Sequence, residues 1–208
     1  MFRTINMTLL DIHCTLMQVK SICVKKKNSQ NPNLWIFLDD DRIDDEISFL
    51  KSLPFNRSLG VVVRTKNNRN LYKKSKMVGK IAKLKGFKLL VSSNLQIALS
   101  VGAFGVHFPK EIKKNRMHKT LFYSCSFHEF SDVRRVIDLK VKTVFISPIF
   151  KTTSDKKKKP IGLTRLLFLS RSLKCEIGVL GGISKKNIKK FRKKNISHFA
   201  GVNMFLSD

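Results

Sequence analysis

The chain has 208 residues, of which 42% are hydrophobic; this suits one folded domain with a sizeable core and excludes a disordered chain. It carries 42 lysine and arginine residues against 14 aspartate and glutamate residues, which gives a formal net charge of +28. A balance this basic points to anionic partners, namely nucleic acid, an acidic membrane or phosphorylated metabolites.

Residues 1–33 form an N-terminal arm to which we assign no function. Its apolar residues are interrupted by Asp11, His13 and Lys20, so the arm lacks the uninterrupted apolar core and the cleavage site of a secretory signal. It could be an amphipathic arm or sequence upstream of the true start.

From Trp35 onward, short apolar, β-branched or aromatic runs alternate with longer polar stretches of helical spacing. Continuous hydrophobicity is typical of strands that are buried on both faces of a parallel sheet. Eight such strands are predicted, at 34–38, 59–64, 87–92, 104–108, 120–126, 143–148, 176–182 and 198–205. The helices predicted between them are 44–50, 71–85, 95–101, 130–139, 163–173 and 184–194. The last would begin at Ser184 as N-cap, with Asn187 three residues on.

This alternation predicts an α/β fold, a (β/α)₈ TIM barrel formed as a single domain by residues 34–208. A doubly wound open sheet is the alternative. The sequence ends soon after the eighth predicted strand, so we expect the last helix to be short, missing or supplied by the N-terminal arm.

The positions of the charged and apolar residues along the chain help to choose among these classes of partner. The lysines are scattered over almost every segment and no aromatic-rich basic strand is present, so we expect no specific nucleic-acid partner. No apolar run approaches the ~20 residues of a membrane span, so we expect no membrane partner. The cysteines show no CxxC spacing, which argues against a zinc site or disulfide framework and favours a cytoplasmic location. We expect phosphorylated small molecules as partners and leave the oligomeric state open.

The working residues of a barrel lie just after its strands, where the loops converge on one mouth. Arg64 and Lys66 follow the second predicted strand, Ser93 follows the third and Ser126 ends the fifth. Two cations at a strand end favour a binding role for anions, although they could also be solvated turn residues.

The loops after the sixth and seventh strands offer phosphate-binding chemistry. Thr152 and Lys156 follow the sixth strand, and the basic run 156–159 is interpreted mainly as a solvated loop. Gly181 and Gly182 follow the seventh strand and lead into a predicted helix. Glycines allow close backbone approach, and a helix N-terminus offers unpaired N–H groups to a phosphate.

Other polar residues near strand ends have simpler interpretations. Residues 39–41, three aspartates, could bind a metal, but turn chemistry and the start of a helix explain them equally well. We interpret His128 as a residue at the start of a helix rather than a base, and His107 as a packed or exposed histidine.

Several strand-end motifs occur in a fixed order along the chain. They are VVVRTK (61–66), LQIALSVGAFGVH (95–107), SFHEFSDV (126–133), SPIFKTTS (147–154), PIGL (160–163) and VLGGISKKN (179–187), followed by HFAGVNMF. In this order they resemble the thiamine phosphate synthase family and its thiazole tautomerase relatives. The resemblance covers residues 35–205 and implies a (β/α)₈ barrel that joins a pyrimidine diphosphate to a thiazole phosphate, with Mg²⁺ assisting the release of diphosphate.

The resemblance also implies roles for particular residues. The catalytic residues would be Arg64, Lys66 and Ser126, which match groups that contact the diphosphate. The substrate-binding residues would be Thr152, Gly181 and Gly182, which match the family's phosphate contacts. Lys156 and Ser93 would join them, although the family's strand-six lysine falls on Asp155, beside Lys156, and Ser93 stands in place of an aspartate.

The sequence departs from the family pattern where the metal would bind. Ser92 and Ser93 occupy the positions of an Asn–Asp pair, and Glu111 lies only near the position of the second carboxylate. Mg²⁺ could therefore be bound, but its usual carboxylate ligands are absent and the metal ligands stay unknown. Pro148 stands where the tautomerase branch has its catalytic histidine.

The leading hypothesis is a thiamine phosphate synthase-like protein of thiamine biosynthesis, which as an enzyme would be a transferase. The alternatives are a non-catalytic barrel that binds a thiamine-related phosphate, as a sensor or partner subunit, and a thiazole tautomerase-like protein. Whether the chain is catalytically active is left open.

Overall fold

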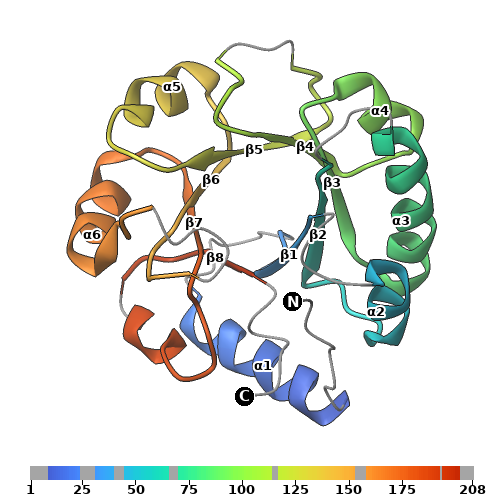
Figure 1. Cartoon of the computed structure of the whole chain (residues 1–208), viewed down its shortest axis with the longest axis horizontal. Coiled ribbons are helices and arrows are strands. Elements are labelled where there is room, and N and C mark those ends of the chain that lie inside the picture. Colours follow the sequence, from blue (N-terminus) through green and yellow to red (C-terminus); the bar gives the residue numbers. More distant parts are fainter. Residues whose placement is uncertain are drawn as a thin grey trace.

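Eight parallel strands close into a barrel in the computed structural model, which describes residues 9–23, 31–39, 45–65, 70–113, 117–152, 158–192 and 194–201 (Figure 1). Each strand pairs with its neighbours in chain order, and the first pairs with the eighth. The strands are β1 Leu34–Leu38, β2 Leu59–Val63, β3 Lys88–Ser92, β4 Gly105–Phe108, β5 Phe122–Phe127, β6 Thr143–Ile146, β7 Glu176–Leu180 and β8 His198–Ala200. The expected (β/α)₈ barrel is confirmed, and all eight predicted strands are present.

Helices surround the barrel (Figure 1). They are α1 Leu9–Ile22, α2 Glu46–Ser52, α3 Leu71–Lys85, α4 Leu95–Ser100, α5 Asp132–Leu139 and α6 Gly162–Ser172. Local chemistry sets their ends: the Asn94 side chain accepts a hydrogen bond from the Ile97 amide at 2.9 Å at the start of α4. Gly86 ends α3 with a φ of 74°, in the left-handed region that glycine adopts freely.

The barrel has two cores because alternate strand residues point inward and outward. The outward-pointing residues pack against the helices in one large cluster. The inward-pointing cluster is rich in rings, with Trp35 stacked on Phe122 at 6.2 Å between centroids and Phe37 edge-on to Phe145 at 5.2 Å. Gly60 leaves room for this filling, since a Cβ there would lie 2.2 Å from the Trp35 ring.

The N-terminal arm supplies a helix to the outer ring. Helix α1 lies in the ring of helices next to the 3₁₀ helix η2 Ile188–Phe191, where a helix after β8 would lie (Figure 1). Its residues Ile12, Leu16 and Val19 are buried in the outer core. Of the three outcomes expected for the last helix, the structure shows the one in which the N-terminal arm supplies it. No helix in the described part of the chain is long and apolar enough to cross a membrane.

The prediction of an α-helix at residues 184–194 is wrong. Only η2 forms there among the described residues, because the polar residues before it make a turn instead. Asn187 accepts a hydrogen bond from the Ser184 amide at 3.0 Å and donates one to the Gly182 carbonyl at 2.7 Å. Ser184 is therefore not the N-cap of an α-helix, and no helix dipole follows Gly181 and Gly182 directly.

A polar cluster closes the end of the barrel opposite the mouth. The His198 ring lies between the Glu176 carboxylate, 2.9 Å from Nε2, and the Pro32 carbonyl, 2.6 Å from Nδ1. Asn31 and Thr143 also donate to Glu176, at 3.1 and 3.2 Å. Burial alone would raise the pKa of Glu176, but the hydrogen bonds from His198, Asn31 and Thr143 lower it below its usual value.

Candidate active site

Arg64 follows β2 and is held at the mouth by two contacts. Its Nη2 lies 2.6 Å from Oδ2 of Asp39, the residue after β1, and its guanidinium lies 4.9 Å from the centroid of the Phe37 ring. The Nε of Arg64 is buried and has no hydrogen-bond partner among the described residues. The guanidinium is thus fixed in place, and its Nε–H could donate a hydrogen bond to an oxygen of a ligand.

Ser126 lies on β5 with its hydroxyl 3.0 Å from Nε2 of His107, a β4 residue whose ring is fully buried inside the barrel. The edge of this ring packs on Phe37, with centroids 5.2 Å apart. Arg64, Phe37, His107 and Ser126 therefore form one continuous set of contacts. This arrangement brings together two of the residues predicted to contact diphosphate.

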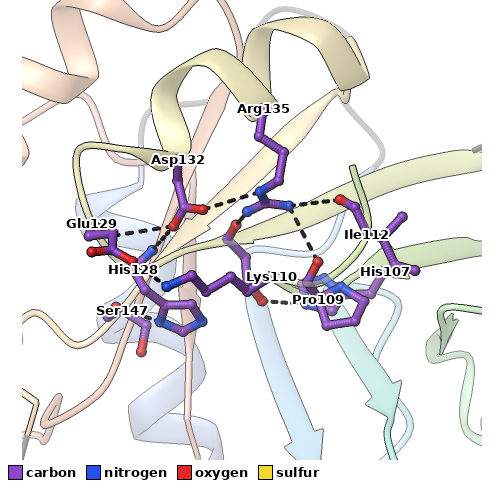
Figure 2. A network of polar contacts seen from close by, with 10 residues as sticks. His107, Pro109, Lys110, Ile112, His128, Glu129, Asp132, Arg135 and Ser147 are labelled. Carbon is purple, nitrogen blue, oxygen red and sulfur yellow. Dashed lines mark hydrogen bonds and ion pairs between the residues drawn. The ribbon is translucent and has the colours of Figure 1, made fainter. Parts of the chain in front are cut away.

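A buried ion pair fixes the loop after β5 (Figure 2). Arg135 donates to the carbonyls of Ser126, Pro109 and Ile112 and pairs with Asp132 at 3.2 Å. The other oxygen of Asp132 accepts the amide of His128 at 2.7 Å and that of Glu129 at 3.3 Å. The network ties the β4 and β5 loops together.

The His128 ring lies between the β5 and β6 ends of the mouth (Figure 2). Its Nδ1 lies 2.9 Å from the Ser147 carbonyl, which can only accept, so Nδ1 carries a hydrogen. Burial lowers the pKa of His128, although the Ser147 carbonyl opposes this shift. Helix α5 begins at Asp132, so His128 lies in the loop before the helix and not at its start as expected.

Gly181 and Gly182 both have positive φ angles, of 89° and 70°. A Cβ on Gly182 would lie 2.6 Å from the Lys151 carbonyl oxygen, so the glycines let the β6 loop pack on this turn. Phe150 donates its amide to the Gly181 carbonyl at 3.1 Å. Among the described residues, the amides of Gly182 and Ile183 donate to no acceptor, and they remain available for an anion.

The remaining predicted site residues divide into two groups. Ser93 lies at the mouth with a φ of 64°, and its hydroxyl lies 3.3 Å from that of Ser92. Thr152 lies in the β6 loop and is half-buried. Lys66 and Lys156 lie outside the described residues.

The described acidic residues around the mouth do not fit a metal site. Asp39 is paired with Arg64, Asp132 with Arg135, and Glu129 with Lys110. No group of three or more histidine, cysteine, aspartate or glutamate side chains among the described residues is arranged to hold a metal ion. Residues 40 and 41 of the aspartate run lie outside the described residues.

Sequence analysis missed the supporting residues of this site. Asp39 was considered only as a metal ligand or turn residue, and Asp132 and Arg135 were not singled out. The sequence does contain a signal for the serines that contact His107. Ser124 and Ser126 are polar residues spaced by two in an otherwise apolar strand, which places both on the inner face.

The family model described as thiamine monophosphate synthase matches residues 56–205. The chain is 33% identical over 144 residues to the putative thiamine-phosphate synthase 2 of Aquifex aeolicus, an alignment covering 67% of this chain and 77% of that protein. The chain belongs to the thiamine monophosphate synthase family. It is a thiamine phosphate synthase-like protein of thiamine biosynthesis, as the sequence resemblance implied.

Other members of the thiamine monophosphate synthase family are more distant. The thiamine-phosphate synthase of Prochlorococcus marinus MED4 is 26% identical over 146 residues, which cover 68% of this chain but 42% of that longer protein. A solved thiamine phosphate pyrophosphorylase from Pyrococcus furiosus superposes with a TM-score of 0.66 at 19% identity, over 83% of this chain and 90% of that one. This likeness supports the fold.

Proposed function

We propose that the mouth joins a pyrimidine diphosphate to a thiazole phosphate and releases diphosphate. The observation that carries this proposal is the continuous set of contacts from Arg64 through Phe37 and His107 to Ser126. It holds a cation and a hydroxyl in fixed positions at the ends of β2 and β5. Fixed donors stabilise charge that develops on a leaving group without reorganising during the reaction.

In the proposed reaction, the bond between the pyrimidine methylene carbon and a diphosphate oxygen breaks, and the electron pair leaves with the diphosphate. The thiazole nitrogen then forms the new carbon–nitrogen bond. Arg64 and the Ser126 hydroxyl would bind the departing oxygens, together with Lys66. The amides of Gly182 and Ile183 would hold the phosphate of the thiazole, with Thr152, Lys156 and Ser93 completing the substrate contacts.

The proposed reaction does not rely on Mg²⁺ bound by protein carboxylates. Asp39 and Asp132 are paired with arginines, Glu111 is exposed, and Ser92 and Ser93 offer neutral hydroxyls, whereas Mg²⁺ prefers carboxylate oxygens. We therefore propose that Arg64 and nearby lysines neutralise most of the leaving charge directly.

The same two serines favour a second candidate, a non-catalytic barrel that binds a thiamine-related phosphate. An assay of the purified chain with both substrates, in Mg²⁺ and in EDTA, separates the two. We expect thiamine phosphate to form, with modest dependence on the metal. Binding of the thiazole phosphate without product in either condition would favour the non-catalytic barrel, and absence of both binding and product would contradict both candidates.

A further inference from the structure

The His107 ring bridges two serine hydroxyls inside the barrel. Its Nδ1 lies 2.9 Å from Oγ of Ser124, and its Nε2 lies 3.0 Å from Oγ of Ser126. Ser124 pairs with His107 in the strand register, and Ser126 lies two residues nearer the mouth on the same face of β5. Ser124 and His107 are fully buried, whereas Ser126 retains 5% exposure.

The ring is neutral. Burial lowers the pKa of His107 well below its usual value, and the positive charges of Arg64 and Arg135, with that of His128 when it is protonated, lower it further. No carboxylate contacts the ring among the described residues to offset these effects. A neutral imidazole carries one hydrogen, so one of its nitrogens donates and the other accepts.

Two arrangements satisfy the ring, and they leave different groups unpaired. If Nδ1 donates to Ser124, the Ser126 hydroxyl must donate to Nε2, and the Ser124 hydrogen then has no acceptor. If Nε2 donates to Ser126, Ser124 donates to Nδ1, and only the Ser126 hydrogen stays free. Since Ser124 is fully buried and has no other hydrogen-bond partner among the described residues, the second arrangement avoids a buried unpaired donor.

We propose that Ser124 and His107 are positioning residues that turn the Ser126 hydroxyl hydrogen toward the mouth, as a donor for a phosphate oxygen of the substrate. The identity of this anion rests on the proposed function, whereas the direction of the hydroxyl rests on the buried geometry alone. Ser126 is the end of a three-residue relay that begins in the closed interior of the barrel.

The tautomer of His107 tests the relay in the unliganded protein. A long-range ¹H–¹⁵N spectrum of the imidazoles, with the His107 signals assigned by their loss in His107→Gln, gives the protonated nitrogen. We expect a neutral ring protonated at Nε2. A ring protonated at Nδ1, or at both nitrogens near neutral pH, would overturn the proposal.

Ser124→Ala tests the function of the relay. Without the Ser124 hydroxyl, Nδ1 has no partner in either tautomer, so the ring loses its reason to keep the hydrogen on Nε2. Both tautomers should then be populated, and in one of them the Ser126 hydroxyl turns inward to Nε2. We expect the Nδ1-protonated pattern to appear beside the Nε2-protonated one and the Kd for inorganic pyrophosphate to rise about twofold, because about half of the protein would then present the hydroxyl hydrogen to the anion. Ser124→Thr, which keeps the hydroxyl, should restore both readouts.

Cys125→Ala is the matched control, because Cys125 is equally buried on the same strand but points to the outer core. It should leave the tautomer and the pyrophosphate affinity unchanged. An unchanged tautomer and affinity in folded Ser124→Ala would overturn the relay. If the wild-type protein binds no pyrophosphate, the proposed function fails, and the imidazole pattern still decides the direction of the hydroxyl.

Discussion

Two buried histidines lie at opposite ends of the barrel, and their surroundings differ. His198 faces the Glu176 carboxylate and the Pro32 carbonyl, so both ring nitrogens meet acceptors that the chain itself supplies. His107 faces two hydroxyls, and the charges around it are positive. The groups around His198 are paired within the protein, whereas at the His107 end the Ser126 hydroxyl and the buried Nε of Arg64 have hydrogens to offer an anion. This difference is the reason why we propose anion binding at the mouth and assign a structural role to the opposite end.

The largest effect should come from Arg64→Ala. Loss of the guanidinium removes a fixed donor for the leaving charge, so we expect kcat/KM for thiamine phosphate formation to fall by about 10²–10³-fold. Steady-state kinetics with both substrates measure this effect.

Arg57→Ala is the control for this change, because Arg57 is exposed and precedes β2 at the opposite end of the barrel. It should leave kcat/KM unchanged. Equal losses in the two variants would mean that general charge, and not the position of Arg64, draws the substrate.

Glu176→Gln should affect stability rather than catalysis. The hydrogen bonds that lower the pKa of Glu176 favour the ionised folded state, so their contribution is full above the ordinary pKa of 4.5 and is lost as the pH falls through the folded-state value. We expect about 1.5–3 kcal/mol of destabilisation at neutral pH. Part of the acid dependence of unfolding should also disappear.

Chemical denaturation across pH 3–7 measures both the free energy of unfolding and its dependence on pH, because this range includes the ordinary pKa of 4.5. Glu111→Gln, at an exposed position, is the control and should change neither. A Glu176→Gln variant with wild-type stability throughout would mean that the polar cluster does not contribute to closure of the barrel.

Ser93→Asp tests whether the missing carboxylate limits the use of Mg²⁺. Aspartate tolerates the left-handed φ of 64° that Ser93 already adopts, so the substitution introduces a carboxylate with little backbone strain. We expect Mg²⁺ to stimulate turnover roughly tenfold more than in the wild type, since carboxylate oxygen is its preferred protein ligand. Ser93→Asn separates charge from shape and should give no such gain; a wild-type protein already fully dependent on Mg²⁺ would contradict our account of the mouth.

The sequence predicted the barrel well because its strands are buried on both faces and therefore read as continuous apolar runs. Helix α3 was predicted with its observed bounds, because its apolar spacing ends at Gly86. The prediction of a helix at 184–194 relied on the helical spacing of Ile188 and Phe191. It failed because the Asn187 side chain forms hydrogen bonds with the preceding turn, and only one 3₁₀ turn follows. Local hydrogen bonds of a short polar side chain outweighed the pattern.

The strand-end rule predicted the positions of Arg64 and Ser126 at the mouth, because β2 and β5 were both recognised. It could not predict the partners of these residues. The Asp39–Arg64 pair and the placement of His107 between Ser124 and Ser126 depend on the register between neighbouring strands. That register follows from closure of the whole barrel and has no local signal.

The most direct test of the contrast between the two ends is a titration of the wild-type protein with inorganic pyrophosphate, followed through the imidazole signals of both histidines in one series of spectra. Binding at the mouth should shift the His107 signals, because Ser126 and Arg64 lie within its set of contacts. The His198 signals should stay in place. A shift of His198 with His107 unchanged, or no shift of either ring, would contradict the assignment of anion binding to the mouth.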